Sequence, residues 1–502
     1  MKRPATFRRL LGLLAGALCL LFSMQAMAAG PRVVSGSKAF PESWILGEAL
    51  RALAAESGAE ASHAKNLGGT EIALAALRSG AIDIYAEYTG TIDQVLLPKD
   101  AAGTPGDGRR RQALGEMGIG MSERLGFDDS YALATLPAIA TANDVHSLSD
   151  LVHHPELRLG LTHEFIGRND GLPGLTAHYG FTLANVRGVQ HELAYEALRT
   201  GSIDVLDVYT TDAQIERMGL VTLVDDRHFF PRYDAVLLYR QDLRSRAPAA
   251  FAAMSRLVGA IDTRAMTRAN AAMVLDHRSV EEAAAALVPG GAHAIPPSRG
   301  VAAQIASDTL RHVELVFASL TAAIFIGVPI GIAASRSRRA GPVLLTLTSL
   351  VQTVPSLALL ALLVPLVGIG ARPAIVALLL YGLLPIARNT YTGLTQIAPE
   401  LSRSADALGL SPWAKLRRIS LPLASPMILA GVKTSAVINV GTATIAALVG
   451  ADGLGSPILQ GISLRDTGLI LQGAVPAAGL ALLFELGFAL LSRVVIPRGL
   501  RA

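Results

Sequence analysis

Two stretches of this chain, LRSGAIDIYAEYTGT at residues 77–91 and LRTGSIDVLDVYTTD at residues 198–212, are nearly the same. In the register that aligns them, ten of the nineteen residues from 71 to 89 are identical to those 121 positions later. Each copy has the pattern of an amphipathic helix, a glycine and a short apolar strand, which is half of the βα unit that builds doubly wound sheets. A solenoid would need three or more copies at a shorter period. Two copies therefore predict two similar α/β lobes.

Each copy ends on a Tyr-Thr pair, which places Tyr88 and Tyr209 at duplicated positions. Ligands of open α/β sheets bind beyond the carboxyl ends of the strands, so two facing lobes would bring these tyrosines into one cleft. Tyr131 and Tyr233 lie in loop-like contexts. A single tyrosine is more often a half-buried packing residue, but converging aromatic faces attract a cation that cannot donate hydrogen bonds. Quaternary ammonium groups are the typical guests of such a cage.

The composition changes sharply along the 502 residues. Charged and polar residues are spread through the first part, whereas long apolar runs dominate the last third. A formal net charge of +4, with scattered basic residues, does not suggest a nucleic-acid surface. The predicted divisions are a signal peptide at 1–28, a two-lobed substrate-binding domain at 30–288, a Pro/Gly-rich linker at 289–311 and a membrane domain at 312–502.

The N-terminus begins with basic residues, continues with a short apolar core and reaches Ala-Met-Ala at 26–28. This order is typical of a secretory signal that is cleaved after Ala28, with an uncleaved anchor as the alternative. The single cysteine, Cys19, lies inside that core. The mature chain would then contain neither disulfides nor thiolate chemistry.

The apolar runs predict an all-α domain of five membrane spans. The spans are expected at residues 315–334, 343–367, 374–387, 426–449 and 471–492, and the short third span could be partly re-entrant. If the first domain is exported, the cytoplasmic segments carry eleven Lys and Arg and the outer loops only two, which agrees with the positive-inside rule. Lys433 is expected to extend toward the cytoplasmic end of its span, and Glu485 to face protein rather than lipid.

The motifs GSKAFPESWILGEAL, LGGTEIALAALRSGAIDIYAEYTGT, DVYTTDAQI and FFPRYDA resemble substrate-binding proteins of glycine betaine, choline and carnitine importers. This resemblance covers about residues 32–285. It implies a periplasmic binding-protein fold in which Tyr88, Tyr131, Tyr209 and Tyr233 form the cage. It also points to Thr70 as a contact for the ligand's carboxylate or hydroxyl. Glu71 beside it could act on the ligand, although its copy Glu192 favours a simple helix N-terminal charge.

Residues 398–426 resemble the cytoplasmic loop by which ABC-importer permeases dock on their ATPase. The glycine and the terminal Leu-Pro of that loop are kept, whereas its opening Glu-Ala-Ala is replaced by Arg-Ser-Ala. The alternative is an amphipathic helix that lies on lipid. The resemblance implies the following coupling residues: Ala405, Gly409, Ile419, Leu421 and Pro422.

The sequence contains no Walker phosphate loop and no metal-ligand or Ser/His/Asp pattern. We therefore expect a non-enzymatic transporter component without cofactor or metal, in a bacterial inner membrane, with its binding domain periplasmic and its C-terminus cytoplasmic. Its expected partners are separate cytoplasmic ABC ATPase subunits, a quaternary ammonium ligand, membrane lipid and a second copy of the chain, but no nucleic acid. The alternatives are an importer of another small solute and, less favoured, a periplasmic ligand sensor.

Overall fold

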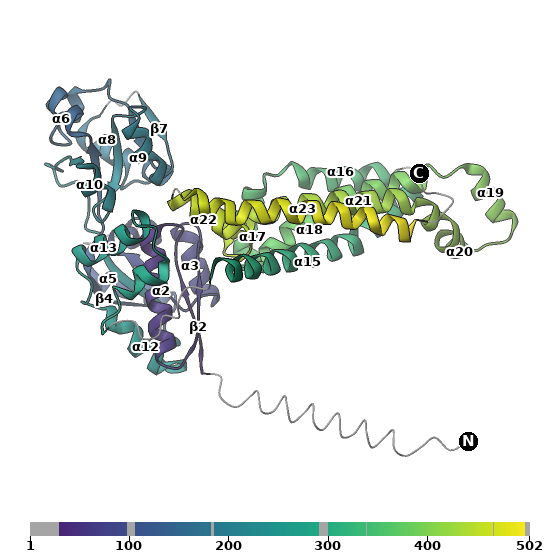
Figure 1. Cartoon of the computed structure of the whole chain (residues 1–502), viewed down its shortest axis with the longest axis horizontal. Coiled ribbons are helices and arrows are strands. Elements are labelled where there is room, and N and C mark those ends of the chain that lie inside the picture. The colour runs from purple at the N-terminus through teal and green to yellow at the C-terminus, as the bar shows by residue number, and fades with distance from the viewer. Residues whose placement is uncertain are drawn as a thin grey trace, which may run out of the picture.

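The computed structural model describes residues 30–97, 106–181, 185–290, 300–337, 339–464 and 466–496. The expected signal peptide lies outside these residues. Two α/β lobes, stacked on each other, occupy one end of a long helical bundle (Figure 1). The α/β part ends with the described segment before residue 291, and the bundle starts after residue 299.

The first lobe has a five-stranded sheet in the order β2-β1-β3-β10-β4. Its strands are β1 (Arg32–Gly36), β2 (Glu60–Ala64), β3 (Ile84–Tyr88), β4 (Ile119–Asp128) and β10 (Asp234–Arg240). β1 runs parallel to β2 and β3, whereas β10 runs antiparallel to β3 and β4. The helical segments of this lobe are α2 (Pro41–Glu56), α3 (Thr70–Ser79), α4 (Thr89–Thr91), η1 (Ile92–Leu96), α5 (Asp107–Glu116), α11 (Leu243–Arg246), α12 (Pro248–Met254), η3 (Ser255–Leu257), α13 (Thr263–Val274) and α14 (Val280–Ala285).

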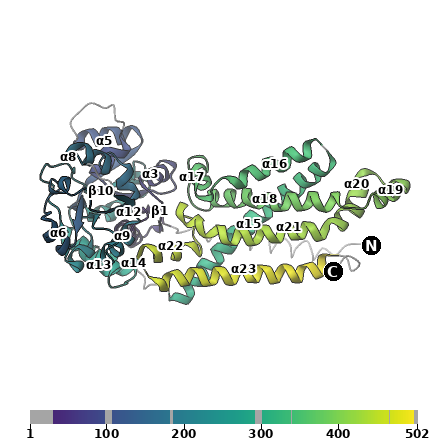
Figure 2. The same ribbon diagram turned by 90° about the horizontal axis from the view of Figure 1, so that it is seen from above.

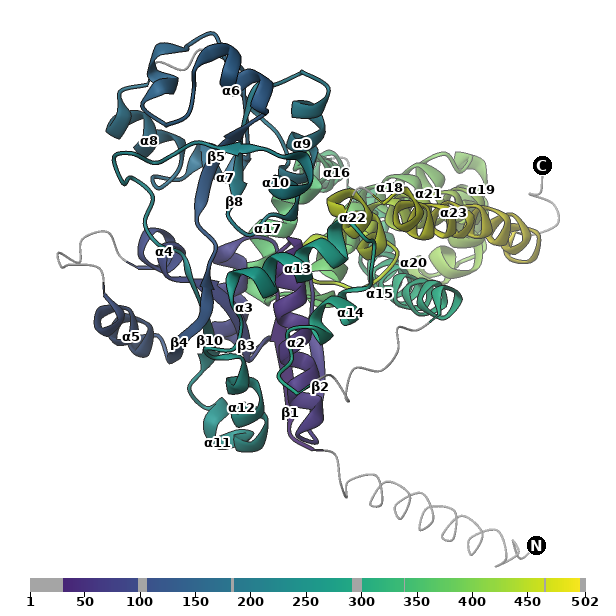
Figure 3. The same ribbon diagram turned by 60° about the vertical axis from the view of Figure 1, so that its left-hand side comes forward.

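The second lobe repeats this plan with the order β7-β6-β8-β5-β9. Its strands are β5 (Tyr131–Thr135), β6 (Leu159–Leu161), β7 (Val186–Gly188), β8 (Val205–Tyr209) and β9 (Val221–Thr222). Its helical segments are α6 (Pro137–Asn143), η2 (Asp150–His153), α7 (His163–Gly167), α8 (Leu172–Tyr179), α9 (His191–Arg199) and α10 (Ala213–Met218). The chain crosses between the lobes twice, from β4 to β5 and from β9 to β10 (Figure 3).

The repeated phrase is a repeated structure, as predicted. α3 leads through Gly80 to β3 and α9 leads through Gly201 to β8, and both glycines have positive φ (76° and 69°). β3 and β8 are each the middle strand of their sheet. The shared aspartate of the phrase also has one role in both lobes: Asp83 accepts the Val34 N–H at 2.8 Å, and Asp204 accepts the Arg158 N–H at 2.9 Å. Each carboxylate thereby ties the middle strand to the neighbouring parallel strand.

The bundle consists of long apolar helices with short helices at both ends (Figure 2). Its elements are α15 (Val301–Arg336), α16 (Ala340–Thr353), α17 (Ser356–Val367), α18 (Ala371–Thr395), α19 (Pro399–Ala407), α20 (Pro412–Lys415), η4 (Leu416–Ser420), α21 (Leu421–Thr442), η5 (Ala443–Val449), α22 (Gly455–Leu464) and α23 (Thr467–Val495). Within the described residues, four helices are long and apolar enough to cross a membrane, or up to five if one bent pair is counted as a span.

The second and third expected spans differ from the structure. Residues 343–367 are not a straight span, because α16 and α17 meet at a bend of 91°. The bend falls at Pro355, which has no N–H to continue the helix. Tyr381 of α18 donates its hydroxyl hydrogen to the Val354 carbonyl there, and Gln352 reaches the Tyr381 carbonyl at 2.8 Å. The third span, expected to be short and partly re-entrant, is instead a continuous helix of 25 residues.

Two further expectations change in the bundle. α15 begins at Val301, so the second half of the expected linker at 289–311 is helical. The hydropathy of the sequence does not reveal this helical start, because the first turns of α15 contain polar side chains. Lys433 does not extend toward a helix end but forms an ion pair with Glu485, which joins α21 to α23. Glu485 thus contacts a neighbouring helix through this pair, although 48% of its side chain is exposed.

The bundle contacts the α/β lobes at one end and carries its longest loop at the other (Figures 1 and 2). Ile72 of α3 packs with Leu360 and Val449, and Leu464 of α22 joins the apolar core that runs through both lobes. The short helices α19 and α20 lie at the opposite end, beyond α18 and α21. One end of the bundle is therefore covered by the α/β lobes, whereas the other end carries the short helices α19 and α20.

Candidate functional site

A cavity of about 280 Å³ lies between the two lobes. This volume is slightly below the range of about 300–1,000 Å³ that is usual for drug-sized ligands, so the cavity suits a small solute. The cavity is lined by all five expected ligand contacts: Thr70, Tyr88, Tyr131, Tyr209 and Tyr233. Tyr88 and Tyr209 end the middle strands β3 and β8, so both sit at the carboxyl ends of strands, where the repeat placed them.

Each lobe contributes two of the four rings. Tyr131 opens β5 directly opposite Tyr209, and their ring centroids are 5.1 Å apart with an interplanar angle of 38°. Tyr233 stands just before β10, and its ring meets Tyr131 edge-on at 5.5 Å and 90°. Phe40, which the sequence reasoning did not single out, stacks on Tyr209 at 6.3 Å and also lines the cavity. The rings thus form adjoining walls rather than a flat stack.

Buried carboxylates hold two of these tyrosines in place. Tyr88 donates its hydroxyl hydrogen to Glu42 Oε1 at 2.5 Å, and Tyr233 donates to Asp170 Oδ2 at 2.5 Å. Burial, together with these carboxylates, raises the pKa of both phenols above the ordinary value for tyrosine, so both are neutral donors. The Tyr88 ring therefore cannot turn away without leaving the buried Glu42 Oε1 without its donor, whereas Asp170 would keep Arg168.

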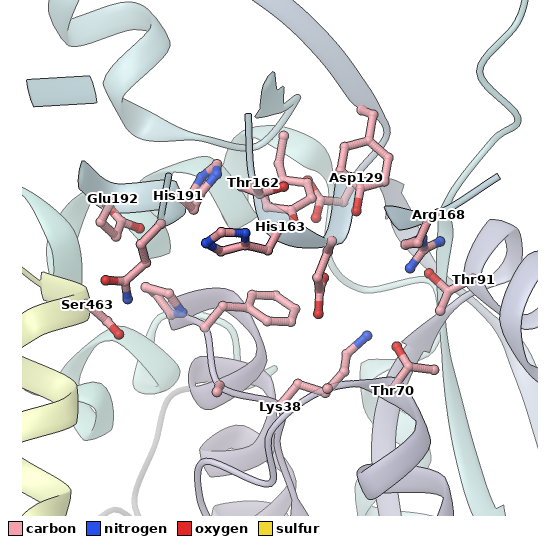
Figure 4. A pocket seen from close by; sticks show the side chains of 18 of the residues that line it. Lys38, Thr70, Thr91, Asp129, Thr162, His163, Arg168, His191, Glu192 and Ser463 are labelled. Carbon is pink, nitrogen blue, oxygen red and sulfur yellow. The ribbon is translucent and has the colours of Figure 1, made fainter. Parts of the chain in front are cut away.

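Cationic and hydroxyl groups face the cavity from one side. Figure 4 shows Lys38, Thr70, Thr91 and Arg168 gathered there. Lys38 Nζ is 2.6 Å from Glu87 Oε1 and 5.0 Å from the centre of the Tyr88 ring. Arg168 pairs with Asp170 and lies 5.8 Å from the centre of the Tyr131 ring. Both cations are buried or nearly so, which makes them strong donors toward a bound anion.

A pair of buried acids lies behind the tyrosines. Thr211 Oγ1 is 2.6 Å from Glu42 Oε2 and 2.7 Å from Asp129 Oδ1. Burial raises the pKa of both carboxyls, and the effect is strongest at Asp129, which also feels the charge of Glu42. Asp129 lines the cavity itself. Nearby, burial alone would lower the pKa of His191, but its ion pair with Asp212, at 3.0 Å, raises it to about 10.

The two duplicated glutamates have different places. Glu71 is exposed in the first turn of α3 and does not line the cavity, which agrees with a simple helix N-terminal charge. Glu192 is buried in the first turn of α9, accepts a hydrogen bond from Gln214 at 2.9 Å and does line the cavity. The duplicated position therefore lines the cavity in the second lobe but not in the first.

The expected coupling residues lie together at the end of the bundle that is far from the lobes. Ala405 is buried in α19, and Gly409 follows that helix with φ of 71°, a left-handed conformation that glycine adopts readily. Ile419 lies in η4, while Leu421 and Pro422 begin α21. The whole segment is thus a helix-turn-helix that leads directly into a spanning helix.

Several residues of the site escaped sequence reasoning: Lys38, Phe40, Glu42, Asp129, Arg168 and Ser463. Lys38, Phe40 and Glu42 belong to the GSKAFPESW motif and Asp129 to FDDSY. The motifs therefore indicated this region of the chain, but nothing in them identified these individual residues as cavity residues. Arg168 and Ser463 carry no sequence signal, because only the tertiary fold brings α7 and α22 to the cavity. Among the described residues there is no cluster of three or more His, Cys, Asp or Glu side chains that could hold a metal ion.

Two family models match the chain, one to each part. The substrate-binding domain of ABC-type glycine betaine transport systems matches residues 31–288. The inner-membrane component of binding-protein-dependent transport systems matches residues 323–499.

The curated relatives match the second part. The chain is 39% identical over 193 residues to the glycine betaine/carnitine/choline transport system permease protein OpuCB of Bacillus subtilis. This match covers 38% of this chain and 89% of the relative. It is 38% identical over 205 residues to the osmoprotectant import permease protein OsmW of Salmonella typhimurium, which covers 40% of this chain and 95% of the relative. Among solved structures, a glycine betaine/carnitine/choline ABC transporter protein is 28% identical with a TM-score of 0.43, over 50% of this chain and 96% of that one.

Proposed function

Since this chain belongs to the family of glycine betaine-type ABC importers, with a substrate-binding domain and an inner-membrane component in one polypeptide, we propose that its cavity binds a zwitterion with a quaternary ammonium head and a carboxylate tail. The chain is a membrane protein and a transporter component, and such components are not enzymes. The observation that carries the proposal is one cavity with tyrosine rings from both lobes and with Lys38 and Arg168 at its side.

The tyrosine walls suit a methylated ammonium group. Such a group cannot donate hydrogen bonds, so it gains little from carboxylate acceptors and is held by ring faces at about 0.5–2 kcal/mol for each contact. Tyr88, Tyr131, Tyr209 and Tyr233 are the rings to which we assign this role. The Tyr131–Tyr209 and Tyr131–Tyr233 pairs meet at 38° and 90°, so these rings stand as adjoining walls of the cavity.

The cations and hydroxyls distinguish among ligands of this class. Choline has a hydroxyl tail, so it would offer Lys38 and Arg168 no negative charge beyond that of their present partners, Glu87 and Asp170. Glycine betaine and carnitine carry a carboxylate that can accept from both cations and from Thr70. A charge-assisted hydrogen bond contributes about 1.5–3 kcal/mol, so we assign the carboxylate to this side of the cavity.

The remaining assignments concern the membrane part. We place the α/β lobes in the periplasm and the helices α19 and α20 in the cytoplasm, supported by their location at opposite ends of the bundle. An ABC ATPase would then dock on the segment from Ala405 to Pro422. Up to five spans are few for a complete pathway, so two copies are proposed to pair as a symmetric dimer. Exposed apolar side chains on α17 and α23, such as Leu362 and Leu482, would face lipid or that second copy.

Calorimetry on the full-length protein tests the choice of ligand. Lys38→Met is expected to weaken glycine betaine binding by about 10–100-fold, because one charge-assisted bond to the carboxylate is lost. Choline binding should be unchanged or tighter, because Glu87 then keeps an unneutralised charge near the cage. Arg199→Met, which removes an exposed cation outside the cavity, is the matched control and should change neither affinity. An equal loss for both ligands in Lys38→Met would contradict the assignment.

A further inference from the structure

One residue of the permease part lines the cavity. Ser463, near the end of α22, lines the same cavity as the tyrosines although it lies more than 200 residues further along the chain. Figure 4 shows it on the side of Glu192, opposite Lys38 and Thr70. Ser463 is only 9% exposed, and the next residue, Leu464, is 7% exposed within the apolar core of the lobes. α22 therefore forms part of the closed site and does not merely lie beside it.

A second contact links the permease to the cavity at the turn before α3. An added Cβ on Gly450, in the loop after η5, would come within 2.8 Å of Leu67 Cδ2, so the two segments are in close contact. Ile72 of α3 packs on the permease residues Leu360 and Val449. The same turn carries Thr70 into the cavity. Two sides of the cavity thus depend on the permease, one directly and one through its support.

α22 packs directly against the spanning helix α23. The Asp466 N–H donates to the Gly461 carbonyl at 2.9 Å, and Asp466 Oδ1 accepts from the Gly468 N–H at 2.7 Å at the start of α23. An added Cβ on Gly461 would be 2.6 Å from the Ile470 nitrogen, so α22 and α23 approach each other at backbone distance. A movement of α23 therefore moves Ser463 as well.

We propose that α22 is a permease-borne wall of the ligand cavity, which encloses the solute through Ser463 and withdraws when α23 moves. This inference rests on the proposed ligand site. Its consequence is that ligand affinity in the full chain is set partly by the membrane domain.

Two variants of the full-length protein in detergent test this, with glycine betaine as the probe. Ser463→Trp should weaken binding about tenfold or more by calorimetry, because a bulky side chain overfills a packed wall. Ile462→Trp is the matched control, since Ile462 is exposed on the same helix, and should remain within about twofold of the unmodified protein. Equal affinity in Ser463→Trp and in the unmodified protein overturns the proposal.

A second measurement guards against misfolding of the tryptophan variant. Cys19 is the single cysteine of the sequence, so a Cys19→Ala background permits selective labelling. We expect glycine betaine to slow maleimide labelling of Ser463→Cys and to leave Ile462→Cys unaffected. Identical rates with and without ligand at Ser463→Cys overturn the proposal. An unmodified protein that does not bind glycine betaine overturns the proposed function instead, and Tyr209→Ala reports on that function independently of α22.

Discussion

Glu42 and Asp129 share a single hydroxyl, and this arrangement predicts that ligand binding is coupled to proton release. Thr211 has one hydroxyl hydrogen, yet its oxygen lies within 2.7 Å of a carboxylate oxygen on each side. It can donate to only one of them, so the other carboxyl must itself be protonated. Glu42 also accepts from Tyr88 and from Asn270, which favours its ionised form. The proton therefore belongs on Asp129, where burial and the charge of Glu42 raise the pKa far above its ordinary value.

A cation in the tyrosine cage should remove this proton. A unit charge about 6 Å from Asp129, at an effective dielectric constant of about 20, stabilises the carboxylate by about 2.8 kcal/mol. This energy corresponds to a fall of about 2 in the pKa of Asp129. The free protein then binds more protons than the complex does, so affinity rises with pH. The rise is at most about tenfold per pH unit, between the pKa of Asp129 in the complex and its pKa in the free protein.

The assay is calorimetry of the full-length protein over a series of pH values, each in two buffers of different ionisation enthalpy, which reports the protons released for each ligand bound. Choline should release more than glycine betaine, because the carboxylate of a zwitterion cancels part of the field. Asp129→Asn should abolish the release and flatten the pH profile. Asp144→Asn, at a carboxylate whose side chain is 97% exposed, is the control and should change nothing. No release in the unmodified protein, or full release in Asp129→Asn, would refute the reasoning.

Three further changes have defined outcomes. Tyr131→Ala should weaken glycine betaine binding by about 1–2 kcal/mol, whereas Tyr131→Phe keeps the ring and most of the affinity by calorimetry. Lys433→Leu should lower the thermal midpoint in detergent more than the double variant with Glu485→Leu, because the single change leaves a carboxylate without its partner; equal midpoints would count against the pair. Gly409→Pro should abolish uptake of labelled ligand by cells but not binding, because proline cannot adopt the φ of 71° at that turn; normal uptake would argue against the coupling role.

The sequence predicted the lobes because their signal was local and duplicated. A helix, a glycine at positive φ and an apolar strand follow one another within about twenty residues, so a second copy confirmed the pattern without tertiary information. The same logic placed Tyr88 and Tyr209 at strand ends. Lys38 and Arg168 do not lie at duplicated positions of the repeat. Each is a single residue in a different loop, so the repeat could not predict them. Only the arrangement of the two lobes brings them to one side of the cavity.

The errors in the membrane part have a common physical origin. Hydropathy measures the length of an apolar run but not its direction, so the run that contains Pro355 was read as straight although a helix bends there by 91°. It also misses helical turns that leave the bilayer, such as those at the start of α15, because their side chains are polar. The partnership of Lys433 with Glu485 depends on the packing of α21 against α23, which neither helix reveals alone.

The cage depends on strand register as well as on the duplication. The repeat supplies Tyr88 and Tyr209, but the other two rings come from the strands at which the chain changes lobe. Tyr131 lies opposite Tyr209, and Ala235, two residues after Tyr233, lies opposite Tyr88. Because side chains alternate between the faces of a strand, a slip of one residue in either pairing would turn a ring away from the cavity. Each of the two strands at which the chain changes lobe therefore also fixes the position of one tyrosine that lines the cavity.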